Sequence, residues 1–261
     1  MAELWFVGLG LGDERGLSRR GEEALRRCER IFAEEYTATL ETGALDRLAK
    51  GIGLPIERLG RTDVESERAI LQALDHSPRV GFVTAGDPFA ATTHVALRLA
   101  AERAGHTWRY VPNASIITAA SGFLGLMAYR FGRTVSLPFP APGFAPTSPI
   151  IEIGKNRSIG AHTLVLLDLR PSEGRFLEAG TAIELLLERD PEHVAVAPDR
   201  EIAVVARVGS ETAEAWVGPA RELARTEFGP PLHAVVILAP ELHFAESEAI
   251  ARFRRSNAPT S

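Results

Sequence analysis

Residues 79–94 read Arg79-Val-Gly-Phe-Val-Thr-Ala-Gly-Asp-Pro-Phe-Ala-Ala-Thr-Thr-His94, and a helical pattern covers residues 95–103. The first five residues have the composition of a β-strand, and Gly86-Asp87-Pro88 is typical of a turn. A strand, a turn and a helix in this order place a carboxylate and exposed backbone groups at the carboxyl edge of a sheet. Small ligands bind at that edge in open α/β sheets, so the segment predicts a ligand-binding loop.

The first half of the chain alternates short strand patterns with helix patterns. The expected strands are residues 4–7, 31–33, 56–59, 79–83 and 107–111. The expected helices are residues 18–30 (with Ser18 near the cap), 42–50, 64–74 and 92–104. This alternation predicts an α/β fold in which helices cover a mostly parallel sheet.

After Val111 the pattern changes. Residues 115–130 predict a helix of small residues and 134–137 a strand, and the five prolines within residues 138–149 predict an irregular loop. The remaining expected elements are strands at 162–169, 202–208 and 233–238 and helices at 179–189, 219–227 and 246–254. We expect a second, mixed α+β domain and a frayed tail at residues 256–261.

Composition and charge disfavour several classes of protein. The 261 residues carry a net charge of −5, which gives no support for a nucleic-acid-binding surface. No apolar run reaches the roughly 18 residues of a membrane span, and the N-terminus has no basic leader. We therefore expect a cytoplasmic protein with neither a nucleic-acid nor a membrane partner. Cys28, the single cysteine, is expected to be a buried structural thiol.

The chain lacks the usual signatures of a strong catalytic group. Its seven histidines show no metal-ligand spacing, and no Ser-His-Asp signature, nucleophile elbow or P-loop is present. The sequence therefore predicts no metal site and no catalytic side chain. Any reaction would depend on the positioning of the reactants.

A glycine-rich turn follows the first expected strand. It reads Gly8-Leu-Gly-Leu-Gly-Asp13, and its glycines permit positive φ and close approach to a ligand. Glu34 and Glu35 follow about twenty residues later, as in a dinucleotide fingerprint. The third glycine of that fingerprint would stand at the position of Asp13, however. A nicotinamide site, a purely structural turn and another kind of ligand loop all remain open from this segment alone.

Asn113-Ala-Ser-Ile116 opens the helix of small residues. The start of a helix has unpaired backbone N–H groups, and Ser115 can either cap them or face a ligand. The segment alone favours the cap.

Taken in order, these motifs resemble those of the diphthine synthases. The matching segments are Gly8-Leu-Gly-Leu-Gly-Asp13, Glu34-x-Tyr36-Thr37, Gly86-Asp-Pro-x-x-Ala-Thr-Thr-His94, Asn113-Ala-Ser-Ile116, Tyr129-x-Phe131-Gly132, Pro146-Thr-Ser148, Gly154-Lys-Asn156, His162-Thr-Leu164, Leu167-Asp168, Ala206-Arg-x-Gly-Ser210 and Phe228-Gly-Pro-Pro-Leu-His233. The resemblance covers nearly the whole chain. The Gly-Asp-Pro loop alone is similar to the wider tetrapyrrole-methylase-like superfamily.

The resemblance implies a two-domain, tetrapyrrole methylase-like fold with an active cleft between its domains. Their expected limits are residues 1–112 and 113–261, earlier than the proline-rich loop that composition alone would favour. The implied activity uses S-adenosylmethionine and releases S-adenosylhomocysteine. The implied substrate is a histidine of translation elongation factor 2 that carries a 3-amino-3-carboxypropyl group, whose amino nitrogen is methylated successively. The implied assembly is a homodimer.

The resemblance also implies which residues bind the cofactor. They are Leu11, Asp87, Ala90, Ser115, Ile116, Leu167, Val208 and His233. Several are apolar, which indicates backbone hydrogen bonds and packing rather than polar side-chain contacts. Phe89-Ala90 and Pro112 depart from the commonest pattern of the family without removing a polar contact.

Methyl transfer from a sulfonium to an amine is an in-line displacement that alignment can accelerate strongly, so it needs no catalytic dyad. We expect Asp87 mainly to orient the cationic cofactor and His233 to contact the adenine side rather than to accept a proton. The alternatives are a related methyltransferase that acts on a tetrapyrrole or on ribosomal RNA, and a non-catalytic nucleotide-binding module. The sequence leaves open the number of methyl groups, the docking surface for the elongation factor, the dimer geometry and the role of residues 138–149.

Overall fold

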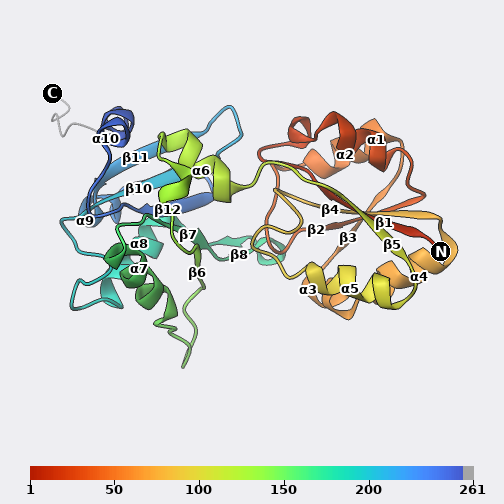
Figure 1. Ribbon diagram of the computed structural model, residues 1–261, viewed down its shortest axis with the longest axis horizontal. Helices are drawn as coiled ribbons and strands as arrows, with labels where there is room; N and C mark the ends of the chain where they lie inside the picture. Colours follow the sequence, from red (N-terminus) through yellow and green to blue (C-terminus); the bar gives the residue numbers. More distant parts are fainter. Residues whose placement is uncertain (255–261) are drawn as a thin grey trace. The chain divides into compact units, whose positions relative to one another are not determined.

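The computed structural model describes residues 1–254 and divides into two compact units, shown as ribbons in Figure 1. Unit 1 contains Met1–Ile116 and Pro171–Glu173, and unit 2 contains Ile117–Arg170 and the residues from Gly174 onward. The boundary expected after residue 112 stays a prediction. The tail expected to fray, residues 256–261, lies outside the described residues.

Unit 1 is built on a five-stranded sheet of order β3-β2-β4-β1-β5, in which all neighbouring strands are parallel. The strands are β1 (Glu3–Gly8), β2 (Arg30–Glu34), β3 (Ile56–Leu59), β4 (Arg79–Thr84) and β5 (Thr107–Val111). The helices are α1 (Arg19–Leu25), α2 (Ala44–Ile52), α3 (Arg61–Ser66), α4 (Arg68–His76) and α5 (Val95–Arg103). The predicted parallel α/β architecture is confirmed.

Two apolar layers hold the helices of unit 1 against its sheet. Buried residues of α1 and α2 pack with one face of the strands, and buried residues of α3, α4 and α5 pack with the other (Figure 1). Cys28 belongs to the first layer, and burial raises the pKa of its thiol to about 12. The prediction of a buried structural thiol is therefore confirmed.

Two predicted helices of unit 1 differ most from the helices observed. Ser18 caps α1 by accepting a hydrogen bond from the Gly21 N–H at 3.0 Å, but the helix ends at Leu25 rather than near residue 30. The single helix expected at 64–74 is wrong, since Glu67 lies between α3 and α4 with a left-handed φ of 61°. Periodicity of apolar residues continues across such a break, which is why the pattern concealed it.

Unit 2 contains a second five-stranded sheet, of order β11-β10-β12-β7-β6. Its strands are β6 (Val135–Leu137), β7 (Thr163–Leu167), β10 (Glu201–Ala206), β11 (Glu214–Pro219) and β12 (His233–Ile237). β6 and β7 are parallel, and the other neighbours are antiparallel. The predicted mixed second domain is thus confirmed. A separate two-stranded ladder joins β8 (Leu169–Arg170) and β9 (Arg175–Phe176).

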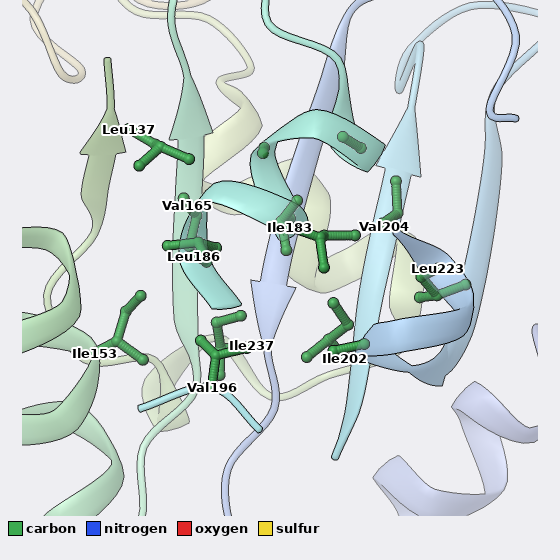
Figure 2. Close-up of a cluster of buried hydrophobic side chains, with 14 of the residues drawn as sticks. Leu137, Ile153, Val165, Ile183, Leu186, Val196, Ile202, Val204, Leu223 and Ile237 are labelled. Carbon is green, nitrogen blue, oxygen red and sulfur yellow. The ribbon is translucent and has the colours of Figure 1, made fainter. Parts of the chain in front are cut away.

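The helices of unit 2 are α6 (which starts at the end of unit 1, Ile116–Leu124), α7 (Ser148–Ser158), α8 (Ala179–Glu188), α9 (Ala220–Leu223) and α10 (Phe244–Ala251). Side chains of α7, α8 and α9 pack against the central strands; Figure 2 shows Ile183 and Leu186 of α8 among Val165, Val204 and Ile237. Among residues 1–254, no helix has the combination of length and apolar character that a membrane span requires.

Several elements of unit 2 differ from the sequence predictions. The helix expected at 115–130 ends at Leu124, because Gly125 has a positive φ of 76°. α7 was not predicted; Pro149 lies in its first turn, where the missing N–H removes no intrahelical bond. β11 was also not predicted, and it pairs along its whole length with β10.

A buried carboxylate joins separate segments of unit 2. Glu246 in α10 accepts hydrogen bonds from the backbone N–H groups of Met127 at 2.9 Å and His243 at 3.0 Å. It also pairs with Arg130, and its Oε1 lies 3.3 Å from Nε2 of His162. Burial would raise the pKa of Glu246, but the two backbone hydrogen bonds and His162 outweigh burial and hold the pKa below its ordinary value.

We expect Glu246→Gln to lower the free energy of unfolding by about 3–5 kcal/mol, because the amide leaves Arg130 without its counter-charge. Urea unfolding at neutral pH measures the loss, and Glu248→Gln on the exposed side of the same helix is the matched control. Because the folded pKa is depressed, the stabilisation is complete above the ordinary value of 4.5 and is lost as the pH falls through the folded value. Equal unfolding midpoints for the two variants would contradict this role.

Candidate functional site

Three loops meet at the carboxyl edge of the parallel sheet in unit 1. β1 lies between β4 and β5, so the segments that follow these strands begin side by side. These segments are residues 8–13, 84–94 and 112–116. The fold therefore brings the glycine-rich turn, the Gly-Asp-Pro loop and the Asn-Ala-Ser motif to one place.

The glycine-rich turn and the Gly-Asp-Pro loop are joined by two backbone hydrogen bonds. The Gly10 N–H donates to the Gly86 carbonyl at 3.1 Å, and the Gly86 N–H donates to the Gly10 carbonyl at 2.7 Å. Both residues have positive φ, 77° and 74°. A Cβ on Gly8 would lie 2.7 Å from the Gly86 carbonyl oxygen. The glycines therefore permit the close approach of two loops, which shows their structural use.

Asp87 organises the loop in which it lies. Its Oδ1 accepts from the Phe89 N–H at 2.9 Å, and its Oδ2 accepts from the Tyr110 hydroxyl at 2.5 Å and the Asn113 N–H at 3.1 Å. The side chain is almost fully buried, with 9% of the residue exposed. Burial, followed by the bond to Asp87, raises the pKa of Tyr110 far above its ordinary value, so the hydroxyl stays a donor. Both carboxylate oxygens of Asp87 are thus already engaged.

Asn113 ties the third loop to the first. Its Nδ2 donates to the carbonyl oxygens of Gly8 at 2.9 Å and Gly16 at 3.0 Å, and its Oδ1 accepts from the Ala114 N–H at 2.8 Å. Ser115 follows immediately before α6. The asparagine of the Asn-Ala-Ser motif therefore has a structural function that sequence reasoning did not assign.

A second buried network lies beside the Gly-Asp-Pro loop. Glu34, at the end of β2, accepts from the backbone N–H groups of Tyr36 and Thr37, each at 3.0 Å, and from the hydroxyls of Thr37 and Thr84. A carboxylate bound in this way faces inward and is 2% exposed. The arrangement speaks against Glu34 as the ribose-binding acid of a dinucleotide site.

His94 connects the same network to the tip of the loop. Its Nδ1 lies 2.8 Å from the Pro88 carbonyl oxygen, and its Nε2 lies 4.0 Å from Oε1 of Glu34 without a hydrogen-bond partner among the described residues. Burial lowers the pKa of His94, although Glu34 and the Pro88 carbonyl oppose the shift. The neutral ring therefore donates from Nδ1 to Pro88. The motif contained both residues, but nothing in their spacing revealed the contact.

Three further predicted cofactor residues, Leu167, Val208 and His233, lie together at one edge of the sheet in unit 2. Ala206, at the end of β10, is paired with His233 at the start of β12, and Ala234 is paired with Leu166 of β7. Leu167 therefore ends the strand beside His233, and Val208 follows closely after β10. Antiparallel pairing with β12 brings these two strand ends and one strand start to the same edge.

The His233 ring is fully used inside unit 2. Its Nδ1 accepts from the Ala179 N–H at 3.4 Å, and its Nε2 lies 3.1 Å from the Pro230 carbonyl oxygen. Burial lowers the pKa of His233, although the Pro230 carbonyl opposes the shift. A neutral ring that donates from Nε2 and accepts at Nδ1 has no lone pair left for a substrate proton. The geometry therefore favours a positioning role over that of a base.

The structure places the eight predicted cofactor residues in two groups. Leu11, Asp87, Ala90, Ser115 and Ile116 follow strands of the parallel sheet in unit 1, and Leu167, Val208 and His233 lie at the edge of the mixed sheet in unit 2. Each group is held by its own backbone pairing and buried polar side chains. That all eight contact one cofactor stays a prediction.

Comparison with known proteins agrees with this architecture. Residues 3–224 match the family described as tetrapyrrole (corrin/porphyrin) methylases. A diphthine synthase from Methanothermobacter thermautotrophicus is 38% identical over 248 residues, which cover 94% of this chain and 93% of that protein. A protein from Arabidopsis thaliana named "Probable diphthine methyl ester synthase" is 37% identical over 275 residues, with 96% and 98% covered.

A solved structure of a diphthine synthase superposes on this chain with a TM-score of 0.88 and 35% identity, covering 97% of this chain and 96% of that one. The match therefore extends through both units, including the part of unit 2 that lies beyond residue 224. The chain belongs to the tetrapyrrole methylase family and, within it, to the diphthine synthases.

Proposed function

We propose that this methyltransferase transfers methyl groups from S-adenosylmethionine to the amino nitrogen of a 3-amino-3-carboxypropyl histidine in translation elongation factor 2. The observation that carries the proposal is the similarity to proteins named diphthine synthase, which extends over more than nine tenths of each chain. We further propose a homodimer and a cytoplasmic location, as the resemblance implies.

The proposed cofactor contacts are Leu11, Asp87, Ala90, Ser115, Ile116, Leu167, Val208 and His233. The residues present suit a cationic, partly apolar ligand. Gly10 and Gly86 keep side chains away from the backbone at the sheet edge, and the Asp87 carboxylate supplies negative charge there. Most of the other positions have apolar side chains, which suit packing around a nucleoside and a methionine chain.

The chemistry depends on alignment more than on a reactive side chain. S-adenosylmethionine supplies a methyl group that is already activated by its sulfonium, and the leaving group departs neutral. Correct alignment of two reactants can contribute on the order of 7–11 kcal/mol to the lowering of a barrier. The residues of this chain therefore act by binding and orienting, which is consistent with Asp87 and Asn113 being used to hold loops.

No dedicated base is needed for the amine. An α-amino group has a pKa near 8, so a modest desolvation leaves enough of the neutral nucleophile at physiological pH. His233 and His94 are both buried, and the ring nitrogen of each that bears the proton faces a carbonyl oxygen. Neither ring is therefore proposed to remove a proton from the substrate.

Mass spectrometry of elongation factor 2 tests the proposed function directly. We expect the precursor histidine to gain successive methyl units after incubation with this protein and S-adenosylmethionine. Full methylation of the nitrogen gives a quaternary ammonium, and an additional base-labile methyl would indicate an ester, as the name of the Arabidopsis relative specifies for that protein. Methylation of a tetrapyrrole or of ribosomal RNA in place of the histidine would refute the proposal.

We expect Asp87→Asn to weaken the binding of S-adenosylmethionine at least tenfold. The amide presents an NH₂ group to donors that now reach a carboxylate, and hydrogen bonds to charged groups contribute about 1.5–3 kcal/mol each. Calorimetric titration measures the dissociation constant, and Asp46→Asn, at an exposed ion pair of the same unit, is the control. Normal binding combined with lost turnover would instead assign Asp87 a chemical role.

His94 allows a test of the contact that holds the Gly-Asp-Pro loop. In His94→Asn the amide nitrogen can take the place of Nδ1 and keep the donation to Pro88, whereas in His94→Gln it reaches toward Glu34 instead. We expect His94→Asn to bind the cofactor with an affinity within about threefold of that of the wild type. We expect His94→Gln to bind it about tenfold more weakly than the wild type does. The reverse order would show that the contact with Glu34, rather than that with Pro88, positions the loop.

A further inference from the structure

Tyr110 lies in β5, an edge strand of the parallel sheet, and is paired in register with Phe6 of β1. Residues that are paired in a sheet have their side chains on the same face. The Phe6 side chain is fully buried in the apolar layer that α3, α4 and α5 cover, and the Tyr110 ring packs against the same layer. None of the sequence motifs contains this tyrosine.

The ring of Tyr110 contacts a residue of the Gly-Asp-Pro loop. The centre of the Phe89 ring lies 5.0 Å from that of Tyr110 and 4.9 Å from that of Phe6. Aromatic rings at such distances attract one another beyond the effect of the apolar area that they bury. Phe89 therefore packs across the paired residues of β1 and β5, and its side chain attaches the loop to both strands.

The Tyr110 hydroxyl is aimed at the same loop. It donates to Oδ2 of Asp87 at 2.5 Å, and the Asn113 N–H donates to the same oxygen at 3.1 Å. Burial, followed by the bond to Asp87, raises the pKa of Tyr110, so the hydroxyl keeps its proton and acts as the donor. One carboxylate oxygen is thus held from two positions at the end of β5.

The three groups that donate to Asp87 are all neutral. They are the backbone N–H groups of Phe89 and Asn113 and the phenol of Tyr110. An arginine or lysine in the place of Tyr110 would oppose the charge of the carboxylate at close range. Neutral donors fix the carboxylate and leave its negative charge to act on a cationic ligand. Of the three donors, the phenol is the one that a substitution can remove without changing the backbone.

We propose that Tyr110 is a positioning residue for the cofactor, because its hydroxyl fixes the orientation of the Asp87 carboxylate and of the loop that contains it. The proposal rests on the proposed function, in which Asp87 binds S-adenosylmethionine. Tyr110 acts through Asp87 and does not itself touch the reactants. Loss of the hydroxyl therefore weakens cofactor binding only while Asp87 is present to be held.

Calorimetric titration with S-adenosylhomocysteine tests this dependence in a double-mutant cycle. The variants are Tyr110→Phe, which keeps the aromatic ring beside Phe89, Asp87→Asn, and the combination of the two. Tyr36→Phe is the matched control, because it removes a buried hydroxyl of the same unit that has no hydrogen-bond partner among residues 1–254.

We expect Tyr110→Phe to bind S-adenosylhomocysteine about five- to tenfold more weakly than the wild type, and Tyr36→Phe to bind it within about twofold of the wild type. In the presence of Asp87→Asn, loss of the Tyr110 hydroxyl weakens binding by no more than about a further twofold. In turnover, Tyr110→Phe raises the KM for S-adenosylmethionine by a similar factor with little change in kcat.

Hydrogen exchange gives a measurement that needs no cofactor. Without the Tyr110 hydroxyl the Asp87 carboxylate is held less firmly, so we expect the amides of Phe89 and Asn113 to exchange about tenfold faster in Tyr110→Phe than in the wild type. The Gly10 amide, whose hydrogen bond does not involve Asp87, is the internal reference and keeps its rate.

Unchanged affinity of Tyr110→Phe, or losses that multiply in the double variant, would overturn the proposal. An equal loss in Tyr36→Phe, or unchanged exchange at the amides of Phe89 and Asn113, would overturn it as well. If the wild-type protein binds neither S-adenosylmethionine nor S-adenosylhomocysteine, the proposed function fails, and the exchange rates still test separately whether Tyr110 holds the loop.

Discussion

Two backbone hydrogen bonds between Gly10 and Gly86 hold the arrangement on which unit 1 depends. They join the segment after β1 to the segment after β4, and they require the backbones of the two segments to approach closely, with no side chain between them. The need for glycine at position 8 and the positive φ values of Gly10 and Gly86 follow from that requirement. Once these loops are joined, Asp87 and Asn113 can reach the third loop and fix its start. The candidate site is therefore organised by backbone geometry first.

Buried carboxylates act in this protein mainly as organisers of loops. Asp87, Glu34 and Glu246 each accept from backbone N–H groups and from side chains on other segments. A carboxylate can accept several hydrogen bonds, and leaving its partners unmatched in the interior would be costly. Each of these residues therefore holds two or more segments in a single arrangement. This use of charge suits an enzyme that works by positioning its reactants.

The two sheets differ in the chemical groups at the edges where the predicted cofactor residues lie. In unit 1 the edge consists of glycine-rich backbone and the Asp87 carboxylate, whereas in unit 2 it consists of apolar side chains and a His233 ring whose nitrogens are occupied.

Local patterns were sufficient for β3 and β5, whose bounds agree with those expected, because short strands flanked by turns depend on neighbouring residues. They also identified the loops that carry the candidate site. Breaks such as Glu67 and Gly125 were missed, since apolar periodicity does not record a single left-handed residue. The hydrogen bond between Glu34 and Thr84 joins residues 50 positions apart. The contact between Arg170 and Phe139 joins segments that follow β7 and β6, which are neighbours in the sheet. Contacts of that kind depend on which strands become neighbours, so only the tertiary structure decided them.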